Sequence, residues 1–63
     1  MNKVKYIRNK SSVGPDVHVV EIYTTDSSNR LISREESTDI NDCINSAYIT
    51  PEQVAWVIEQ ANR

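Results

Sequence analysis

The chain has 63 residues, a formal net charge of −2, one cysteine and one histidine. Cys43 alone cannot form an intrachain disulfide, and a lone thiol is typical of a reducing compartment, so we expect a cytoplasmic location. Cys43 and His18 are too few for a Cys/His zinc site, and we expect neither a metal nor a cofactor. No apolar run reaches about 18 residues, so we expect no membrane span.

The charges are unevenly distributed along the chain. Lys3, Lys5, Arg8 and Lys10 give the first ten residues a charge of +4, and without an apolar stretch this segment does not predict a signal peptide. The remaining residues have three arginines against nine acidic residues, a net of −6. Such polarity can orient a partner during encounter, but ordinary surface solvation is the preferred explanation.

Three segments have the composition of β-strands. Residues 3–8 mix β-branched and aromatic residues with basic ones, as at the edge of a sheet. Residues 9–16 contain the only glycine and one of the two prolines, which predicts a loop. Residues 17–25 are rich in strand formers. Asp, Ser and Asn over residues 26–29 predict a turn, which makes residues 30–36 the returning strand of a hairpin.

A short helix is predicted after Ser37 or Thr38, either of which could cap it. Apolar residues recur there with the spacing of one helical face. They are Ile40, Cys43, Ile44 and Ala47. The residues between them are mainly Asn, Asp and Ser, which are weak helix formers.

The last segment predicts a capped helix from Pro51 to about Asn62. Thr50 is a good N-cap, and Gln53 completes a capping box with it. Proline suits the first helical position. Ile49 before the cap and Val54 within the helix are placed for a hydrophobic staple.

These elements predict a single small α+β domain over residues 1–63. The natural two-layer arrangement is a three-stranded antiparallel sheet packed on the C-terminal α-helix, with a short helix before it. The order of the strands stays open, because the first loop is long. A domain of this size buries only about 60% of its unfolded surface, so a homodimer or another partner is a plausible source of extra stability.

The C-terminal helix places a tryptophan on its polar side. At about 100° per residue, Val54, Val57 and Ile58 cluster on one face, and Trp56 falls nearly opposite them. Its neighbours there are Glu52, Glu59 and Arg63. One interpretation is a partner-binding anchor, because aromatic residues dominate interface energetics. The other is that the short helix, the 9–16 loop or the N-terminal strand covers the ring.

The central strand is apolar on both faces. Val20 and Ile22 share one face, whereas Val19 and Tyr23 lie on the other. One helical layer can cover only one face of a sheet. We therefore regard Tyr23 and Val19 as secondary partner-binding candidates, although cover by the short helix or the loop is the preferred interpretation.

Catalysis is poorly supported. Cys43 and His18 are the only nucleophile and base of the kind that covalent catalysis uses, and they fall in different predicted elements. Cys43 also belongs to an apolar stripe, where a buried structural thiol is the usual occupant. One glycine cannot build a phosphate-binding loop, and no calcium-loop pattern is present. We expect no catalytic residues and no enzyme activity.

We therefore expect a small non-catalytic protein-binding regulator or inhibitor that acts by occupying a surface of its partner. The size is compatible with a bacterial or bacteriophage-encoded protein that binds a host protein. The alternative is a nucleic-acid-binding accessory protein, whose N-terminal strand would contact phosphates and stack a base. That alternative uses Lys3, Lys5, Tyr6, Arg8 and Lys10. The acidic pI of about 5.2 weighs against it, because nucleic-acid modules are usually basic overall.

Overall fold

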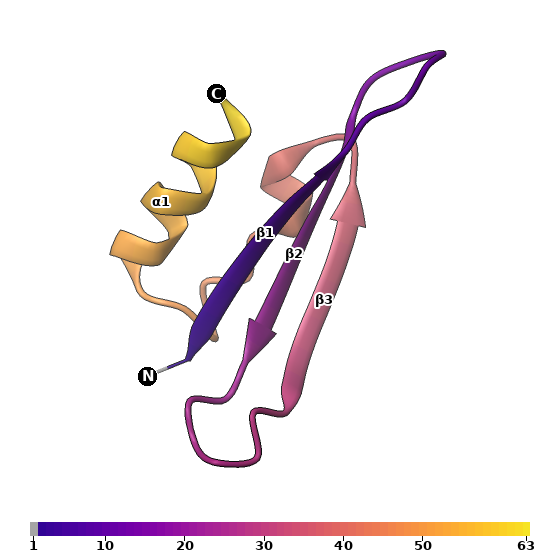
Figure 1. Cartoon of the computed structure of the whole chain (residues 1–63). Helices are drawn as coiled ribbons and strands as arrows, with labels where there is room; N and C mark the ends of the chain where they lie inside the picture. Colours follow the sequence, from indigo (N-terminus) through magenta and orange to yellow (C-terminus); the bar gives the residue numbers. More distant parts are fainter. Residues whose placement is uncertain (1) are drawn as a thin grey trace.

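The computed structural model describes residues 2–63, and it confirms the predicted α+β class. Its elements are β1 (Lys3–Asn9), β2 (Val17–Tyr23), β3 (Leu31–Ser37), the 3₁₀-helix η1 (Ile40–Cys43) and α1 (Pro51–Ala61). The strands form one antiparallel sheet in the order β1-β2-β3, with α1 and η1 beside it (Figure 1). The strand order that the sequence left open is therefore a simple meander.

The register gives the sheet two chemically different faces, because successive side chains of a strand point to opposite sides. Val4 pairs with Ile22, and Tyr6 pairs with Val20. These residues belong to the face that η1 and α1 cover, here called the covered face. The other face is here called the open face. Its residues are Lys3, Lys5, Ile7, Val17, Val19, Glu21, Tyr23, Arg34 and Glu36.

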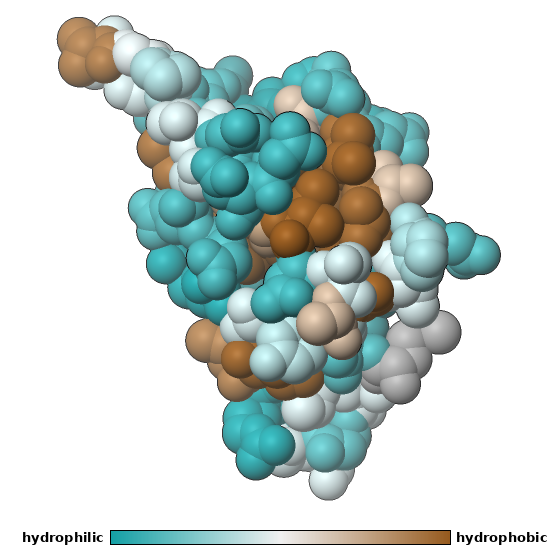
Figure 2. All heavy atoms as spheres, turned by 180° about the vertical axis from the view of Figure 1, so that it is seen from behind, coloured by the Kyte–Doolittle hydropathy of each residue, from teal (hydrophilic) through white to brown (hydrophobic). Residues whose placement is uncertain are grey.

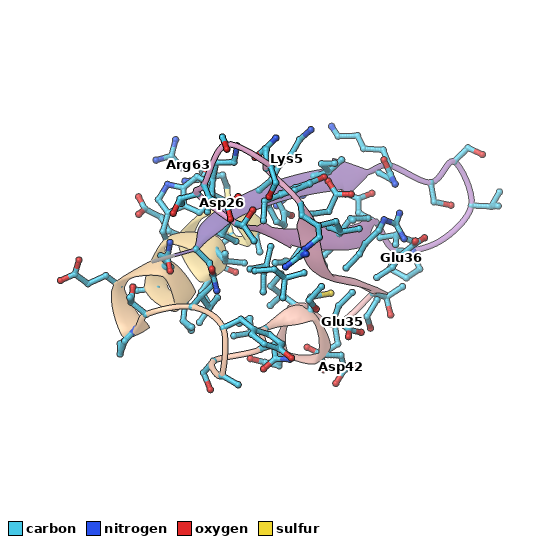
Figure 3. The ribbon with its side chains drawn as sticks, turned by 90° about the horizontal axis from the view of Figure 1, so that it is seen from below. Lys5, Asp26, Glu35, Glu36, Asp42 and Arg63 are labelled. Carbon is cyan, nitrogen blue, oxygen red and sulfur yellow. The ribbon has the colours of Figure 1, made fainter. Side chains whose placement is uncertain are left out.

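The core lies between the covered face and the two helices. Its buried members come from β2, η1, the segment before α1, and α1 itself, and they are Val20, Ile22, Cys43, Ile49 and Val57. Seen along the sheet, Lys5 points away from η1, whereas Asp42 lies on η1 at the opposite side (Figure 3). The two helices therefore share one face and neither packs on the other, although Val19 on that other face is only 1% exposed. The expectation that the short helix or the 9–16 loop covers the second face is wrong.

The predicted capping box at the start of α1 is confirmed. The Thr50 hydroxyl accepts a hydrogen bond from the Gln53 backbone N–H at 3.2 Å, and the Gln53 side chain accepts one from the Thr50 backbone N–H at 2.9 Å. Ile49 is buried and Val54 packs against the same cluster, as a hydrophobic staple requires. The helix ends at Ala61 with Asn62 as its C-cap, one residue before the predicted end.

The predicted short helix is reduced to the single 3₁₀ turn of η1. The Asp39 carboxylate caps that turn by accepting from the Asn41 backbone N–H at 3.0 Å. After η1, the Asn45 side chain accepts a hydrogen bond from the Ala47 backbone N–H at 3.1 Å. This bond stabilises a separate turn. Asn and Asp side chains compete with helical hydrogen bonds in this way, so the apolar spacing does not extend into an α-helix.

The strand boundaries differ from the prediction by a few residues. β2 ends at Tyr23 instead of residue 25, because the Thr24 hydroxyl accepts from the Arg30 backbone N–H at 2.8 Å and closes the following loop. The β1–β2 ladder continues as far as the pair Asn9–Val17. Residues 10–16 form a loop that projects beyond the sheet (Figure 1) and makes the molecule elongated, at 39 × 22 × 17 Å.

Arg8 attaches β1 to the C-terminal end of α1. Its guanidinium donates to the carbonyl oxygens of Arg63 at 2.8 Å and Gln60 at 3.1 Å, and also to that of Ala61. The last carbonyls of a helix lack intrahelical partners and carry the negative end of its dipole, so a cation is stabilising there. The last turn of α1 has no basic residue of its own, and Arg8 supplies one from β1.

Candidate functional site

Trp56 lies on the outer side of α1, as the helical wheel predicts. Its side chain is 42% exposed, whereas its neighbour Val57 is fully buried. η1 belongs to the core on the inner side of the helix, and the 9–16 loop projects away from the sheet. Val4 of β1 lines the same hollow as the ring. Trp56 is therefore partly buried and partly exposed, with Val4 of β1 on one side of the adjoining hollow.

A shallow hollow of about 230 Å³ lies beside the indole ring. Its lining residues are Val4, Thr50, Glu52, Gln53 and Trp56. The polar groups of Thr50 and Gln53 are already engaged in the capping box, and the Gln53 amide also donates to the Asn2 carbonyl at 2.7 Å. The hollow thus has apolar walls, fixed by β1 and by the first turn of α1.

The two acidic residues near Trp56 differ in their partners. Glu59 forms an ion pair with Arg63 at 3.2 Å, in an i, i+4 arrangement. Glu52 forms no ion pair with any other residue in the range 2–63. Because Glu52 precedes Trp56 by four residues, its carboxylate and the indole are neighbours on the helix surface. The rim of the hollow therefore has one negative charge without a cation.

The secondary candidates lie on the open face, away from Trp56. Val19 is only 1% exposed, so its side chain offers a partner almost no surface. Its cross-strand neighbours are Ile7 and Glu36. The Tyr23 ring has the Lys3 ammonium 5.7 Å from its centroid, and Lys3 also donates to the Asn29 side chain at 2.9 Å. Burial, and then the nearby Glu21 carboxylate, raise the pKa of the Tyr23 hydroxyl.

The basic residues of the alternative nucleic-acid site do not share one surface. Lys3 and Lys5 point to the open face, whereas Tyr6 and Arg8 point to the covered face. Lys10 lies in the projecting loop. The Tyr6 hydroxyl is 2.6 Å from His18 Nδ1 and accepts from Arg8 Nε at 3.2 Å, so its polar group is engaged within the fold. Alternation along β1 thus separates the residues that such a site would need together.

The thiol and the imidazole have separate partners. Cys43 is fully buried, and its Sγ donates to the backbone carbonyl of His18 at 3.4 Å. Burial raises the pKa of the thiol above its ordinary value of 9.0. The His18 ring contacts Tyr6 instead. Within residues 2–63, no three His, Cys, Asp or Glu side chains are grouped so as to hold a metal ion. No helix of that range is long and apolar enough to span a membrane.

Two apolar surfaces were not predicted from the sequence. Val13, in the projecting loop, is 88% exposed. A larger apolar area is visible on the side of the molecule shown in Figure 2. Separately, Ile40, Ile44 and Val54 pack against the core while half-buried. The Val-Gly-Pro sequence of the loop could have indicated the first surface.

The chain has no match among known family models, curated proteins or solved structures.

Proposed function

We propose that this chain is a small, non-catalytic protein-binding regulator or inhibitor, and that it binds its partner through Trp56. The observation that carries the proposal is the 42% exposed indole beside an apolar hollow on the outer side of α1. Aromatic residues at the centre of a contact contribute much of its binding energy when a partner excludes water around them. The site comprises Trp56, Glu52 and Val4, with Glu59 and Arg63 at its rim.

The rigidity of the support favours this surface over the rest of the chain. The capping box and the hydrogen bond from Gln53 to Asn2 fix the first turn of α1 against the start of β1. A preorganised site loses less conformational entropy on binding than a mobile one. On the open face, Lys3 already lies over Tyr23 and Val19 is 1% exposed, so a partner would gain less contact surface there.

The proposed mode of action is occupancy of a partner surface, without chemistry. The lone cysteine of the chain suits a reducing compartment, and the cytoplasm is therefore the proposed location. The hollow is smaller than the roughly 300 to 1,000 Å³ typical of small-molecule sites, which favours a side chain of a protein partner over a free ligand.

The test is affinity capture from a lysate of the source cell with the wild type, Trp56→Ala and Val13→Ala. Val13→Ala is the matched control, because it removes another exposed apolar side chain from a different part of the surface. Circular dichroism first establishes that all three are folded. We expect one protein to be recovered by the wild type and by Val13→Ala but not by Trp56→Ala. The purified protein should then bind Trp56→Ala at least tenfold more weakly in calorimetry, as for a residue that anchors an interface.

Equal recovery by Trp56→Ala would remove the site, and loss of recovery only in Val13→Ala would move it to the projecting loop. Recovery of nucleic acid that salt elutes would support the alternative function instead.

A further inference from the structure

The hollow beside Trp56 combines two features that recognise one class of side chain. One is the apolar wall made by the indole and Val4, and the other is the Glu52 carboxylate at the rim. We infer that the hollow receives an arginine or lysine side chain from the partner, so that the partner contributes a basic residue at the centre of the contact. This inference rests on the proposed function, since it names the chemistry of the residue that meets Trp56.

The apolar part of the hollow suits the stem of a long basic side chain. Lys and Arg bury their methylene groups along apolar surfaces while the charged head stays near water or a counter-charge. A cation over the face of an indole is also attracted electrostatically by the partial negative charge of that face. At about 230 Å³, the open hollow has room for one such side chain.

The carboxylate supplies the charge complement. Glu52 is exposed and has no ion pair among residues 2–63, whereas Glu59 on the same helix is already paired with Arg63. Thr50 and Gln53 also line the hollow, but their side chains are held by the capping box. Among the residues that line the hollow, Glu52 is therefore the one whose carboxylate can form an ion pair with a partner.

Within residues 2–63, the basic side chains of β1 are not placed to fill the hollow. Lys3 and Lys5 point to the open face, on the other side of β1 from Val4. Arg8 is bonded to the last carbonyls of α1, at the far end of the helix. Because no ion pair to Glu52 is formed within residues 2–63, we take its complement to be a cation from another molecule.

The α1 dipole indicates where the cationic head lies. The positive end of a helix repels a cation close to the N-cap, here Thr50. The Glu52 carboxylate offsets that charge one residue into the helix, and Trp56 lies one turn further along. The head is therefore expected between Glu52 and the indole, with the stem against Val4.

The test uses the full chain and two small probes of similar length. Nα-acetyl-L-argininamide has a charged head, and Nα-acetyl-L-norleucinamide has an uncharged linear side chain. The chain has one tryptophan, so a single indole N–H signal in the ¹H–¹⁵N spectrum reports on the hollow. The titrations are made with the wild type, Glu52→Gln, and Glu35→Gln as a matched control that removes the same charge from an exposed residue of β3, outside the proposed site.

We expect argininamide to shift the Trp56 indole signal saturably, with a dissociation constant in the millimolar range. Glu52→Gln should weaken that binding about threefold to fivefold, the size of a partly exposed ion pair. Glu35→Gln should change it less than twofold. Norleucinamide should bind more weakly than argininamide, with no effect of Glu52→Gln.

Equal binding of the two probes, no saturable shift with argininamide, or no effect of Glu52→Gln would each overturn the inference. These results are separable from failure of the proposed function. One outcome is a captured partner that needs Trp56 but binds Glu52→Gln as tightly as it binds the wild type. That outcome would contradict only the inference that a basic side chain of the partner enters the hollow. A partner that binds Trp56→Ala normally would contradict both.

Discussion

The open face of the sheet and the Trp56 hollow are both accessible to solvent. They differ in the extent to which their charged and aromatic side chains are already paired within the fold. On the open face, Arg34 lies 3.6 Å from Glu21 and 2.9 Å from Glu36, and Lys3 lies over Tyr23. At the hollow, Glu52 forms no ion pair within residues 2–63, and Trp56 is 42% exposed. Accessibility alone therefore does not identify a binding surface, whereas unmet interactions distinguish the two regions.

The largest expected effect on stability comes from the open face. Val19→Ala removes two methyl groups from a side chain that is 1% exposed, and we expect it to lower the free energy of unfolding by about 2 kcal/mol. Trp56→Ala should cost about 1 kcal/mol or less, because the ring is only partly buried and alanine is the better helix former. Urea unfolding of both variants measures the difference. A larger loss for Trp56→Ala would identify Trp56 as a core residue.

The second largest effect is expected at Arg8. We expect this residue to stabilise the packing of α1 on β1, and therefore the hollow that the two elements line. Arg8→Gln removes the charged hydrogen bonds to the end of the helix, and we expect a loss of about 1.5 kcal/mol. Lys10→Gln is the matched control, since it removes a charge from the exposed loop and should change stability by less than about 0.5 kcal/mol. Equal effects of the two variants in urea unfolding would show that Arg8 acts only through net charge.

A smaller effect is expected from the ion pairs of the open face. Arg34 is 45% exposed, so Arg34→Gln should destabilise the fold by about 0.5 kcal/mol, and by less in high salt. Binding of the captured partner should not change. A loss of partner binding in Arg34→Gln that exceeds the loss in Glu52→Gln would reverse the comparison between the two regions.

The buried thiol provides a measure of whether each variant keeps its core closed. Burial raises the pKa of Cys43 above 9.0, which favours the uncharged thiol in the folded state. The resulting stabilisation is complete below the pKa of the unfolded thiol and is lost as the pH rises through the folded value. We therefore expect a small decrease in unfolding free energy above about pH 9 that Cys43→Ser does not show. An aromatic disulfide reagent should react at pH 8 only through unfolding, and rapid reaction of the folded wild type would contradict this.

The parts of the fold that local chemistry decides were predictable from the sequence. The capping box at Thr50 and Gln53, the three strands and the outward position of Trp56 follow from residue types at fixed spacings. The length of η1 was not predictable from apolar spacing, because hydrogen bonds from Asp39 and Asn45 to nearby backbone groups outweigh it. The near-complete burial of Val19 depends on the cross-strand neighbours that the register supplies, and that register was unknown.

The candidate site was predictable only in part. The helical wheel identified Trp56 and Glu52, but Val4 joins them through the packing of α1 on β1, which is a contact between the two ends of the chain. The same alternation that brings Val4 to the hollow sends Lys3 and Lys5 to the open face. A set of basic residues that is contiguous in sequence is thus divided between two surfaces.

The most direct test of the central claim is site-specific photocrosslinking with p-benzoyl-phenylalanine placed at position 56 or at position 23. Both positions hold an aromatic residue in the wild type, and each variant is irradiated with the captured partner after its fold has been checked. We expect a covalent adduct from position 56 and none above background from position 23. An adduct from position 23 alone would place the partner on the open face and would contradict the assignment of the Trp56 hollow as the binding site.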